Sequence, residues 1–438
     1  MNISILSVFK ELYEPFLQTS LLKRAQENGI VSIETASFSD FAFPKKRIDA
    51  PTFGPGAGML IKPVVVEKAI QHFQERKGKA FKIFFSPQGQ KLDQPLLKTI
   101  AQKAQDAGHL MLIPARYEGM DARVEAEYAD MTVSVGDFVL MGGDIPAMML
   151  LEGMLRLIPG VVGKQESVEQ ESFSGPFLDY PEYTEPVEWH GITVPEIVRS
   201  GHHAEIEKWR TEQAVKKTVL HNFAWLRAYP VTDAQKKLAA SYIPAHYLVL
   251  MHDEVFSGPE RTVGTTSVMS IDIHDIARSS STYGMKKFFI VTPLIDQQKI
   301  IKKFFSFWHS ASGIAYNANR HEALNLVSVV DRLEAAIADI EKREGKKPLL
   351  IGTSARETAG KQISFYDQGV VWQEGRPVIL LLGTGQGLSD QLIDRCDYVL
   401  NPIHGFHDFN HLSVRSAAAI IMDRWLGLNE RIDKKLPE

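Results

Sequence analysis

Short apolar runs alternate with helix-like stretches through most of the chain, and this alternation constrains the fold more than any other feature. In the first half, residues 3–9, 81–85 and 110–113 have the apolar character and flanking turn residues of buried strands. Residues 16–28 and 95–107 have helical spacing. Strands that alternate with helices at this pitch predict a layered α/β domain with a largely parallel sheet.

The same alternation starts again at residues 247–251. Three more apolar runs and two helical stretches follow, at residues 288–291, 349–351, 378–382, 324–342 and 414–426. The second half therefore predicts another α/β domain of about the same size, which indicates two related modules in one chain.

The two halves are joined by a segment of different character. Residues 161–196 are rich in Gly, Ser, Glu, Pro and Tyr without a defined period, which is typical of a long connection. Residues 196–246 are expected to be helical and carry a net charge of +3, against -4 for the whole chain. Such a segment fits either a solvated helical face or a surface that contacts RNA.

Composition narrows the class of protein. The chain has 438 residues, of which 44% are hydrophobic and 23% charged, and this balance excludes a disordered chain, a collagen-like fibre and a coiled coil. Its single cysteine, Cys396, excludes an internal disulfide and indicates a reducing compartment. Because no apolar run approaches the ~20 residues that cross a bilayer, we expect a cytoplasmic protein without a membrane partner.

Glycine-containing turns mark candidate ligand sites. In the first half they occupy residues 53–59, 84–89, 115–121 and 134–143, and at least two directly follow strands. Loops at the carboxyl ends of parallel strands meet at one edge of a sheet, so these turns are expected to line one cleft.

In the second half, Gly383-Thr-Gly-Gln-Gly-Leu388 follows the apolar run 378–382 and would let the backbone approach a ligand closely. Its spacing is not the dinucleotide fingerprint, so a nicotinamide site is a distant alternative. We predict no metal site, because His404, His407 and His411 have few carboxylates and no cysteine nearby.

Longer motifs carry a family resemblance. In the first half they are residues 86–89, 116–121, 134–143, 156–160, 200–206 and 209–210. Residues 1–246 resemble bacterial tRNA (guanine-37-N1)-methyltransferases along the whole length of those enzymes. The family belongs to the SPOUT superfamily, and the resemblance implies a deep trefoil knot, S-adenosylmethionine (SAM) held by the knot loops, and homodimers with the site at the subunit interface.

The second half resembles another SPOUT module, of the kind found in RNA methyltransferase-like proteins. The motifs that carry this resemblance are residues 272–278, 383–388, 398–402 and 410–415. The expected architecture is thus two mostly parallel α/β domains, each with a SPOUT-type trefoil knot, and a small helical domain between them. The expected boundaries are 1–165 for the first SPOUT domain, 166–195 for the linker, 196–246 for the helical tRNA-binding domain, 247–430 for the second SPOUT domain and 431–438 for the tail.

The resemblance implies formation of 1-methylguanosine at tRNA position 37, next to the anticodon. N1 of guanine carries a proton, so the reaction needs a base, and charge that develops on O6 needs a donor or a cation. Glu171 stands where the family usually has an aspartate base, and Arg156 matches the arginine that contacts the guanine. Glu118 matches a carboxylate near the methyl donor. The alternatives are a surface glutamate, an exposed helical arginine and a turn-capping residue, respectively.

The resemblance also implies which residues bind SAM. In the first module they are Phe84, Phe85, Ser86, Pro87, Ala115, Tyr117, Gly119, Val135, Gly136, Phe138, Leu140, Gly142, Gly143 and Pro146. In the second they are Gly383, Gly385, Gly387, Leu388, Pro402, His411 and Ser413. Ala115 departs from the family's glycine and adds a methyl group against the cofactor loop.

RNA contacts are expected at His202, Trp209 and Arg210 of the helical segment and at Arg278 of the second module. The partner would be a tRNA with guanine at position 37, and Mg²⁺ is associated with the family although no ligand set identifies a site. The second module has no base that the sequence assigns, so its substrate stays open. The alternative function is a noncatalytic RNA-binding protein in one or both halves.

Overall fold

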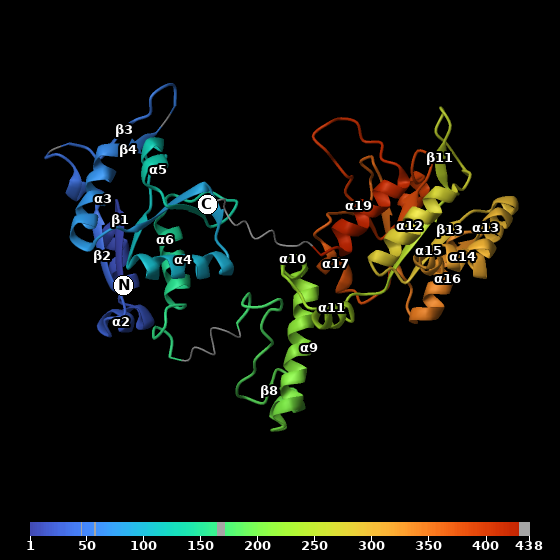
Figure 1. Ribbon diagram of the computed structural model, residues 1–438, viewed down its shortest axis with the longest axis horizontal. Helices are drawn as coiled ribbons and strands as arrows, with labels where there is room; N and C mark the ends of the chain where they lie inside the picture. The colour runs from blue at the N-terminus through green and yellow to red at the C-terminus, as the bar shows by residue number, and fades with distance from the viewer. Residues whose placement is uncertain (45, 57, 164–170, 429–438) are drawn as a thin grey trace. The chain divides into compact units, whose positions relative to one another are not determined.

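A computed structural model describes residues 1–44, 46–56, 58–163 and 171–428 (Figure 1). The chain divides into two compact units, Met1–Ser174 and Gly175–Glu438. Each unit is built around one sheet in which every strand runs parallel to its neighbours, so the predicted α/β class is confirmed.

The first unit has a five-stranded sheet in the order β2-β1-β6-β5-β7. Its strands are β1 (Asn2–Ser7), β2 (Ser32–Ser37), β5 (Phe81–Lys91), β6 (His109–Ile113) and β7 (Met131–Ser134). All three strand-like runs predicted in this half lie in it. A short antiparallel pair, β3 (Asp49–Pro51) and β4 (Met59–Ile61), stands apart from the sheet.

Helices cover both faces of this sheet, because alternate strand residues point to opposite faces and most of them are apolar. One face packs against α1 (Tyr13–Leu17), α2 (Ser20–Glu27), α4 (Gln94–Ala107) and α6 (Asp144–Leu155). The other packs against α3 (Pro63–Lys77) and α5 (Ala122–Tyr128). The described part of the unit also contains two short 3₁₀ turns, Lys10–Leu12 and Phe38–Phe41.

One helix prediction in this unit needs correction. The stretch 16–28 is not a single helix, because the chain turns between α1 and α2 at Gln18 and Thr19. Thr19 is extended, and its hydroxyl donates to the backbone oxygen of Phe16 at 2.7 Å. Threonine commonly competes with helical hydrogen bonds in this way, and the helical period runs through the break without marking it.

The second unit has a seven-stranded sheet in the order β14-β13-β10-β17-β15-β18-β16. Its strands are β10 (His246–Met251), β13 (Lys287–Val291), β14 (Val327–Val330), β15 (Leu349–Thr353), β16 (Gln362–Ile363), β17 (Val378–Gly383) and β18 (Tyr398–Leu400). The four strand-like runs predicted here all lie in this sheet. A hairpin of β11 (Val255–Ser257) and β12 (Thr262–Gly264) follows β10.

The two sheets share a strand order. When the strands of the first unit are numbered along the chain, they lie in the sheet as second, first, fourth, third and fifth. The strands β10, β13, β15, β17 and β18 repeat this order, with β14 and β16 added at the edges. This common topology supports the interpretation of two related modules.

Helices also cover both faces of the second sheet. In Figure 1, α12 (Ser270–Thr282) and α19 (Val414–Leu426) pack together on one face. The other helices that follow β13 are α13 (Ile295–Trp308), α14 (Ala311–Tyr316), α15 (Ala318–Leu324), α16 (Leu333–Glu344), α17 (Gln368–Trp372) and α18 (Asp390–Ile393). The helix predicted over 324–342 is wrong in its first part, because β14 lies within it.

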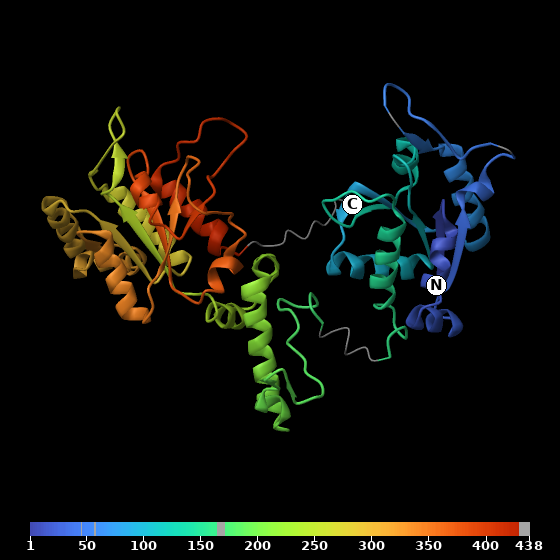
Figure 2. The ribbon, with the colours of Figure 1, turned by 180° about the vertical axis from the view of Figure 1, so that it is seen from behind.

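The helical segment between the sheets belongs to the second unit. It contains the helices α8 (Glu196–Arg199), α9 (His203–His221), α10 (Phe223–Ala228) and α11 (Asp233–Ala240), as predicted. A short hairpin precedes them, formed by the two-residue strands β8 (Glu188–Trp189) and β9 (Ile192–Thr193). Figure 2 shows that the long α9 has its carboxyl end nearer the second sheet, where Gln373 donates to the Leu220 carbonyl.

Arg227 of α10 explains this attachment. Its buried guanidinium donates to the backbone oxygens of Asp423, Arg424 and Gly427, where α19 ends. The last carbonyls of a helix lack partners within the helix and carry partial negative charge, so an arginine is a fitting cap.

None of the helices in the described ranges is both long enough and apolar enough to cross a membrane.

Candidate functional site

In the first unit, the loops after β6 and β7 are held together by a buried carboxylate. Asp144, the first residue of α6, accepts from Arg116 Nε at 2.6 Å. Its other oxygen accepts from Ser7 Oγ at 2.6 Å and from Tyr13 Oη at 3.0 Å. Burial and the adjacent carboxylate raise the pKa of Tyr13, so its hydroxyl stays a donor. Asp144 thereby fixes the loop after β6 to the end of β1.

Glycines allow the same two loops to approach each other. The Gly143 nitrogen donates to the Ala115 carbonyl at 2.7 Å. A Cβ at Gly143 would lie 2.9 Å from the backbone of Pro114, and one at Gly142 would lie 2.4 Å from Arg116 Cδ. Glycine is therefore required at both positions, and Ala115 is accommodated beside them.

A third loop meets this pair. The Glu118 nitrogen donates to the Met59 carbonyl at 3.1 Å, and the Gly119 carbonyl accepts from Ile61 at 3.1 Å. Gly58 lies so close to Glu118 that a Cβ there would meet its side chain at 2.2 Å. The prediction that the glycine turns of the first half gather at the carboxyl edge of the sheet is thus supported for parts of the turns 53–59, 115–121 and 134–143. The turn predicted at 84–89 is wrong, because these residues lie within β5.

Of the predicted SAM-binding residues of this unit, Phe84 to Pro87 lie within β5, Pro146 lies in the first turn of α6, and the others lie in the loops after β6 and β7. Their side chains differ in access. Phe84 and Pro146 are buried, so only their backbone or packing could serve a ligand. Tyr117 is half exposed and has a φ of 60°, while Phe138 and Leu140 are exposed. Gly143 is also buried. The other members are half-buried or exposed, namely Phe85, Ser86, Pro87, Ala115, Gly119, Val135, Gly136 and Gly142.

The predicted base and the predicted arginine are in contact. The Arg156 guanidinium, just after α6, donates to a Glu171 carboxylate oxygen. Both side chains are partly exposed, at 39% for Arg156 and 30% for Glu171. An ionised carboxylate only accepts hydrogen bonds and a guanidinium only donates them. The pair therefore presents an acceptor next to donors, and solvent reaches both.

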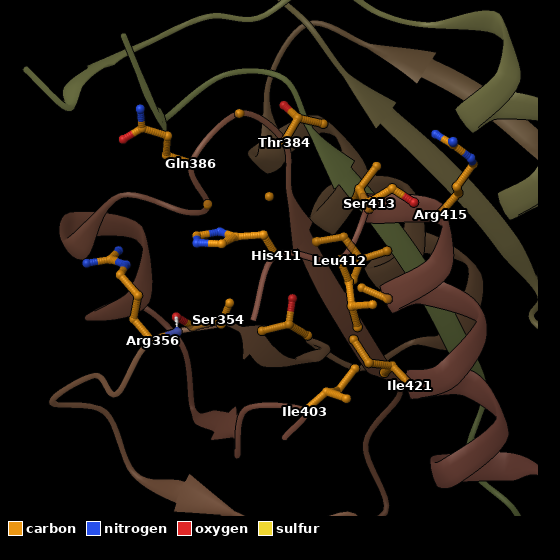
Figure 3. A pocket seen from close by; sticks show the side chains of 18 of the residues that line it. Ser354, Arg356, Thr384, Gln386, Ile403, His411, Leu412, Ser413, Arg415 and Ile421 are labelled. Carbon is orange, nitrogen blue, oxygen red and sulfur yellow. Dashed lines mark hydrogen bonds between the residues drawn. The ribbon is translucent and has the colours of Figure 1, made fainter. Parts of the chain in front are cut away.

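The second unit contains a cavity of about 930 Å³ at the carboxyl edge of its sheet (Figure 3). It is lined by residues 353–356 after β15, 383–387 after β17, and 401–414 after β18 in part. These loops follow the strands that correspond to β5, β6 and β7 of the first unit. Its volume is near the upper end of the range of ~300–1,000 Å³ for small-molecule sites.

Most residues predicted to bind the donor in this unit line the cavity. They are Gly383, Gly385, Gly387, His411 and Ser413, and Figure 3 shows His411 projecting into its centre. Leu388 is buried behind the loop, and neither it nor Pro402 is among the lining residues. A Cβ at Gly385 would lie 2.6 Å from the Phe256 carbonyl, which explains the glycine there.

Sequence reasoning missed several other lining residues. They include His252, Arg261, Thr266, Asp272, Arg356, Thr384 and Arg415. A signal existed for His252 and Arg356, because both follow apolar runs predicted as strands, and ligands bind at the carboxyl ends of parallel strands. Asp272, Thr384 and Arg415 lie in the motifs 272–278, 383–388 and 410–415 that carry the family resemblance. Arg261 had no signal, since only the fold brings it to the cavity.

His252 has a defined protonation state. Thr384 Oγ1 donates to the Met251 carbonyl at 2.8 Å, so it must accept from Thr266 Oγ1 at 2.6 Å. Thr266 in turn accepts from His252 Nδ1 at 3.0 Å. The ring therefore carries its proton on Nδ1, and burial lowers its pKa to about 4. Within the described residues its Nε2 has no partner.

The predicted RNA-contacting residues lie on two elements. His202 is exposed at the start of α9, and Trp209 packs near Tyr183 with ring centroids 6.3 Å apart. Arg210 lies over the Tyr180 ring at 4.5 Å. Arg278, on α12, lines a separate smaller cavity rather than the large one. The described residues contain no group of three or more His, Cys, Asp or Glu that could hold a metal ion.

Comparison with known proteins agrees with this geometry. Residues 1–226 match the family model described as tRNA (Guanine-1)-methyltransferase TrmD. The chain belongs to this family. Residues 245–427 match a second model, described as SAM-dependent RNA methyltransferase. The resemblance of both halves to the SPOUT superfamily is thereby confirmed.

Relatives within the tRNA (guanine-1)-methyltransferase family fall into two lengths. Proteins named tRNA (guanine-N(1)-)-methyltransferase from Nitratidesulfovibrio vulgaris and Oleidesulfovibrio alaskensis are each 37% identical over 433 residues, covering 98% of this chain and 99% of the relative. One from Staphylococcus haemolyticus is 40% identical over 243 residues, covering 55% of this chain and 97% of the relative. The matches to the first two relatives therefore include the second unit. The match to the third covers nearly all of that relative without including the second unit.

Proposed function

We propose that this protein transfers the methyl group of SAM to N1 of guanine in tRNA, at position 37 next to the anticodon. Membership of the tRNA (guanine-1)-methyltransferase family supports the reaction class. The contact between Arg156 and Glu171 is the observation that carries the choice of guanine. The N1–H and O6 of guanine are a neighbouring donor and acceptor, and a carboxylate beside a guanidinium complements that edge.

The chemistry follows from this complementarity. Glu171 would take the N1 proton as the N1–CH₃ bond forms and the CH₃–S bond of SAM breaks, its electron pair passing to sulfur. Arg156 would donate to O6, where negative charge develops as the proton leaves. SAM supplies an activated methyl group, and the loops around Ala115 and Gly142 would hold it. Glu118, beside Gly58 at the same edge, would offset the sulfonium charge.

The proposed assembly is a cytoplasmic homodimer. Val139, Met141 and Ile145 are exposed by 90%, 91% and 53%, and they follow one another in the loop after β7 and at the start of α6. Clustered exposed apolar residues of this kind mark protein contacts. A second copy covering them would close the donor loops, as the resemblance implies. We also propose that the first sheet contains a trefoil knot and that α9 contacts the tRNA. The reaction is further proposed to require Mg²⁺.

A tRNA transcript with guanines at positions 36 and 37 tests the reaction. After incubation of the full chain with SAM and digestion of the RNA, nucleoside mass spectrometry should detect 1-methylguanosine. A transcript with adenine at position 37 should yield none. Absence of 1-methylguanosine from a sample that binds S-adenosylhomocysteine (SAH) would contradict the proposal and favour a noncatalytic RNA-binding role for the first unit.

For the second unit we propose the same methyl donor, with an RNA substrate. The match to a SAM-dependent RNA methyltransferase model and the cavity bordered by Gly383, Gly385 and Gly387 support it. Glycines at the carboxyl end of a strand let the backbone enclose an adenosine-like ligand.

The stoichiometry of SAH binding tests this second donor site. Calorimetry should find two molecules per chain in the wild type and one in Gly385→Val, because a side chain there meets the Phe256 carbonyl. Gly375→Val is the matched control: its φ of 61° is close to the 60° of Gly385, but it lies away from the cavity and a Cβ there meets only Lys346 Nζ at 3.8 Å. One molecule per wild-type chain would argue against donor binding in this unit.

A further inference from the structure

The β11–β12 hairpin is fixed to the glycine loop at the large cavity. The Phe256 nitrogen donates to the Gly387 carbonyl at 2.9 Å, and the Gln386 nitrogen donates to the Phe256 carbonyl at 2.8 Å. Val255 also forms a bridge with Leu388. The hairpin therefore belongs to the cavity wall, although more than a hundred residues separate it from the loop.

Two arginines lie over the ring of Phe256. The guanidinium carbon of Arg261, in the hairpin turn, is 4.7 Å from the ring centre, and that of Arg356, after β15, is 5.1 Å from it. Both residues line the cavity, and Figure 3 shows Arg356 at its border. A guanidinium that stacks on an aromatic ring keeps its N–H edge free for a bidentate contact with phosphate or carboxylate.

The positive charge of this pair is poorly compensated. Among the residues that the structure describes, Asp272 is the only carboxylate that lines the cavity, and it accepts from Arg415 at 3.1 Å. In the described part of the chain, Arg356 forms one ion pair, with Asp390 at 3.5 Å, and one long hydrogen bond, to the Leu388 carbonyl at 3.4 Å. The Asp390 side chain is 72% exposed, and exposed pairs contribute little. Arg261 forms no ion pair within the described residues. The site therefore favours an anionic ligand.

The charges of the methyl donor and of RNA indicate which of these two substrates is the anionic ligand. The methyl donor carries a positive sulfonium, which two arginines would repel, whereas RNA carries a phosphate at every nucleotide. We propose that Arg261 and Arg356 form a phosphate clamp that positions RNA at the second cavity. The inference rests on the proposed function of this unit as an RNA-modifying module, and it assigns the RNA side of that site. Phosphate contacts fix the register of a nucleic acid without reading its sequence.

The salt dependence of RNA binding tests the clamp. The probe is a fluorescein-labelled RNA of 20 random nucleotides, and its affinity for the full chain is measured by anisotropy between 50 and 200 mM KCl. The double variant Arg261→Gln, Arg356→Gln should bind about tenfold more weakly at the lowest salt. Its slope of log affinity against log salt should be shallower by about 1 to 1.5, at roughly 0.7 per lost phosphate contact to a single strand.

The matched control removes two charges from the opposite edge of the same sheet. Lys346 and Lys347 are exposed and precede β15, whereas Arg356 follows it. The variant Lys346→Gln, Lys347→Gln should keep the wild-type slope and affinity. A slope for the arginine variant equal to that of this control would overturn the clamp, provided that tryptophan fluorescence shows both variants to be folded.

SAH titration distinguishes the clamp from its rival and from the donor proposal. The arginine variant should bind SAH with unchanged affinity. If its SAH affinity fell more than tenfold while RNA binding stayed constant, the arginines would hold the carboxylate of the donor, and the clamp would be wrong. If the second unit of the wild type bound no SAH but the arginine variant still lost its salt slope, the clamp would stand and donor binding would fail.

Discussion

Replacing Glu171 with Gln is expected to reduce the rate of 1-methylguanosine formation by at least about a hundredfold, because general base catalysis contributes roughly 10²–10⁴. Glutamine preserves the shape of the side chain and its contact with Arg156 but cannot take the N1 proton. Arg156→Ala should lower the rate by about 10²–10³ through loss of the donor to O6. The measurement is single-turnover methylation of a guanine-37 transcript at saturating SAM.

Three comparisons make this result specific. Glu152→Gln changes an exposed carboxylate one turn before Arg156 on α6 and should leave the rate unchanged. Glu171→Asp keeps a carboxylate and should lose less activity than Glu171→Gln. The double variant at 156 and 171 should be little slower than the worse single variant, because groups that act on one transition state are not additive. A rate for Glu171→Gln within about threefold of the wild type would exclude Glu171 as the base.

The central strands of both sheets could be predicted because they are buried on both faces, whereas β2, β7, β14, β16 and β18, nearer the sheet edges, were not predicted. Runs such as 247–251 and 378–382 are almost entirely apolar, as strands covered by helices on two sides must be. The strand at 327–330 was predicted as part of a helix, because only a few residues separate it from α15 and α16 and the helical spacing of its neighbours continues through it. Three of its four residues are valine, and this enrichment in β-branched residues was the signal to use.

The candidate sites were predictable where they depend on local backbone shape. Glycines 142, 143 and 385 predict that their loops lie close to other backbone segments, and the structure confirms this at residues 114–116 and at Phe256. What the sequence could not show was which side chains meet across the fold. Asp144 joins Arg116 to Ser7 from three separate elements, and Arg261 meets Arg356 over one ring. Those pairings depend on strand order, which local pattern does not determine.

Acidification is expected to destabilise the second unit through two buried histidines. His246 Nδ1 donates to the Pro244 carbonyl at 2.6 Å, while its Nε2 accepts from the indoles of Trp372 at 3.2 Å and Trp425 at 2.9 Å. A protonated ring would lose both acceptor contacts, and burial lowers its pKa to about 4. His252, neutral beside the large cavity, has a pKa lowered to about 4 for the same reason.

The direction follows from comparing folded and unfolded chains. An unfolded histidine has a pKa near 6.5, so between about pH 6.5 and 4 the unfolded chain binds protons that the folded chain excludes. Stability is therefore complete above about pH 7 and is lost as the pH falls through this window. At pH 5 the loss relative to pH 8 is about 2 kcal/mol for each histidine, or about 4 kcal/mol for the two.

Tryptophan fluorescence during urea unfolding can measure this loss in one unit alone, because all six tryptophans of the chain lie in residues 175–438. The unfolding free energy at pH 5 should be about 4 kcal/mol below that at pH 8. His246→Gln should lower stability at pH 8 yet remove about half of the pH dependence, whereas His203→Gln, at an exposed position on α9, should preserve it. Equal stability of the wild type at the two pH values would mean that these rings bind protons in the folded chain as readily as in the unfolded one. The neutral state described above for His252, with its proton on Nδ1, would then be wrong at pH 5.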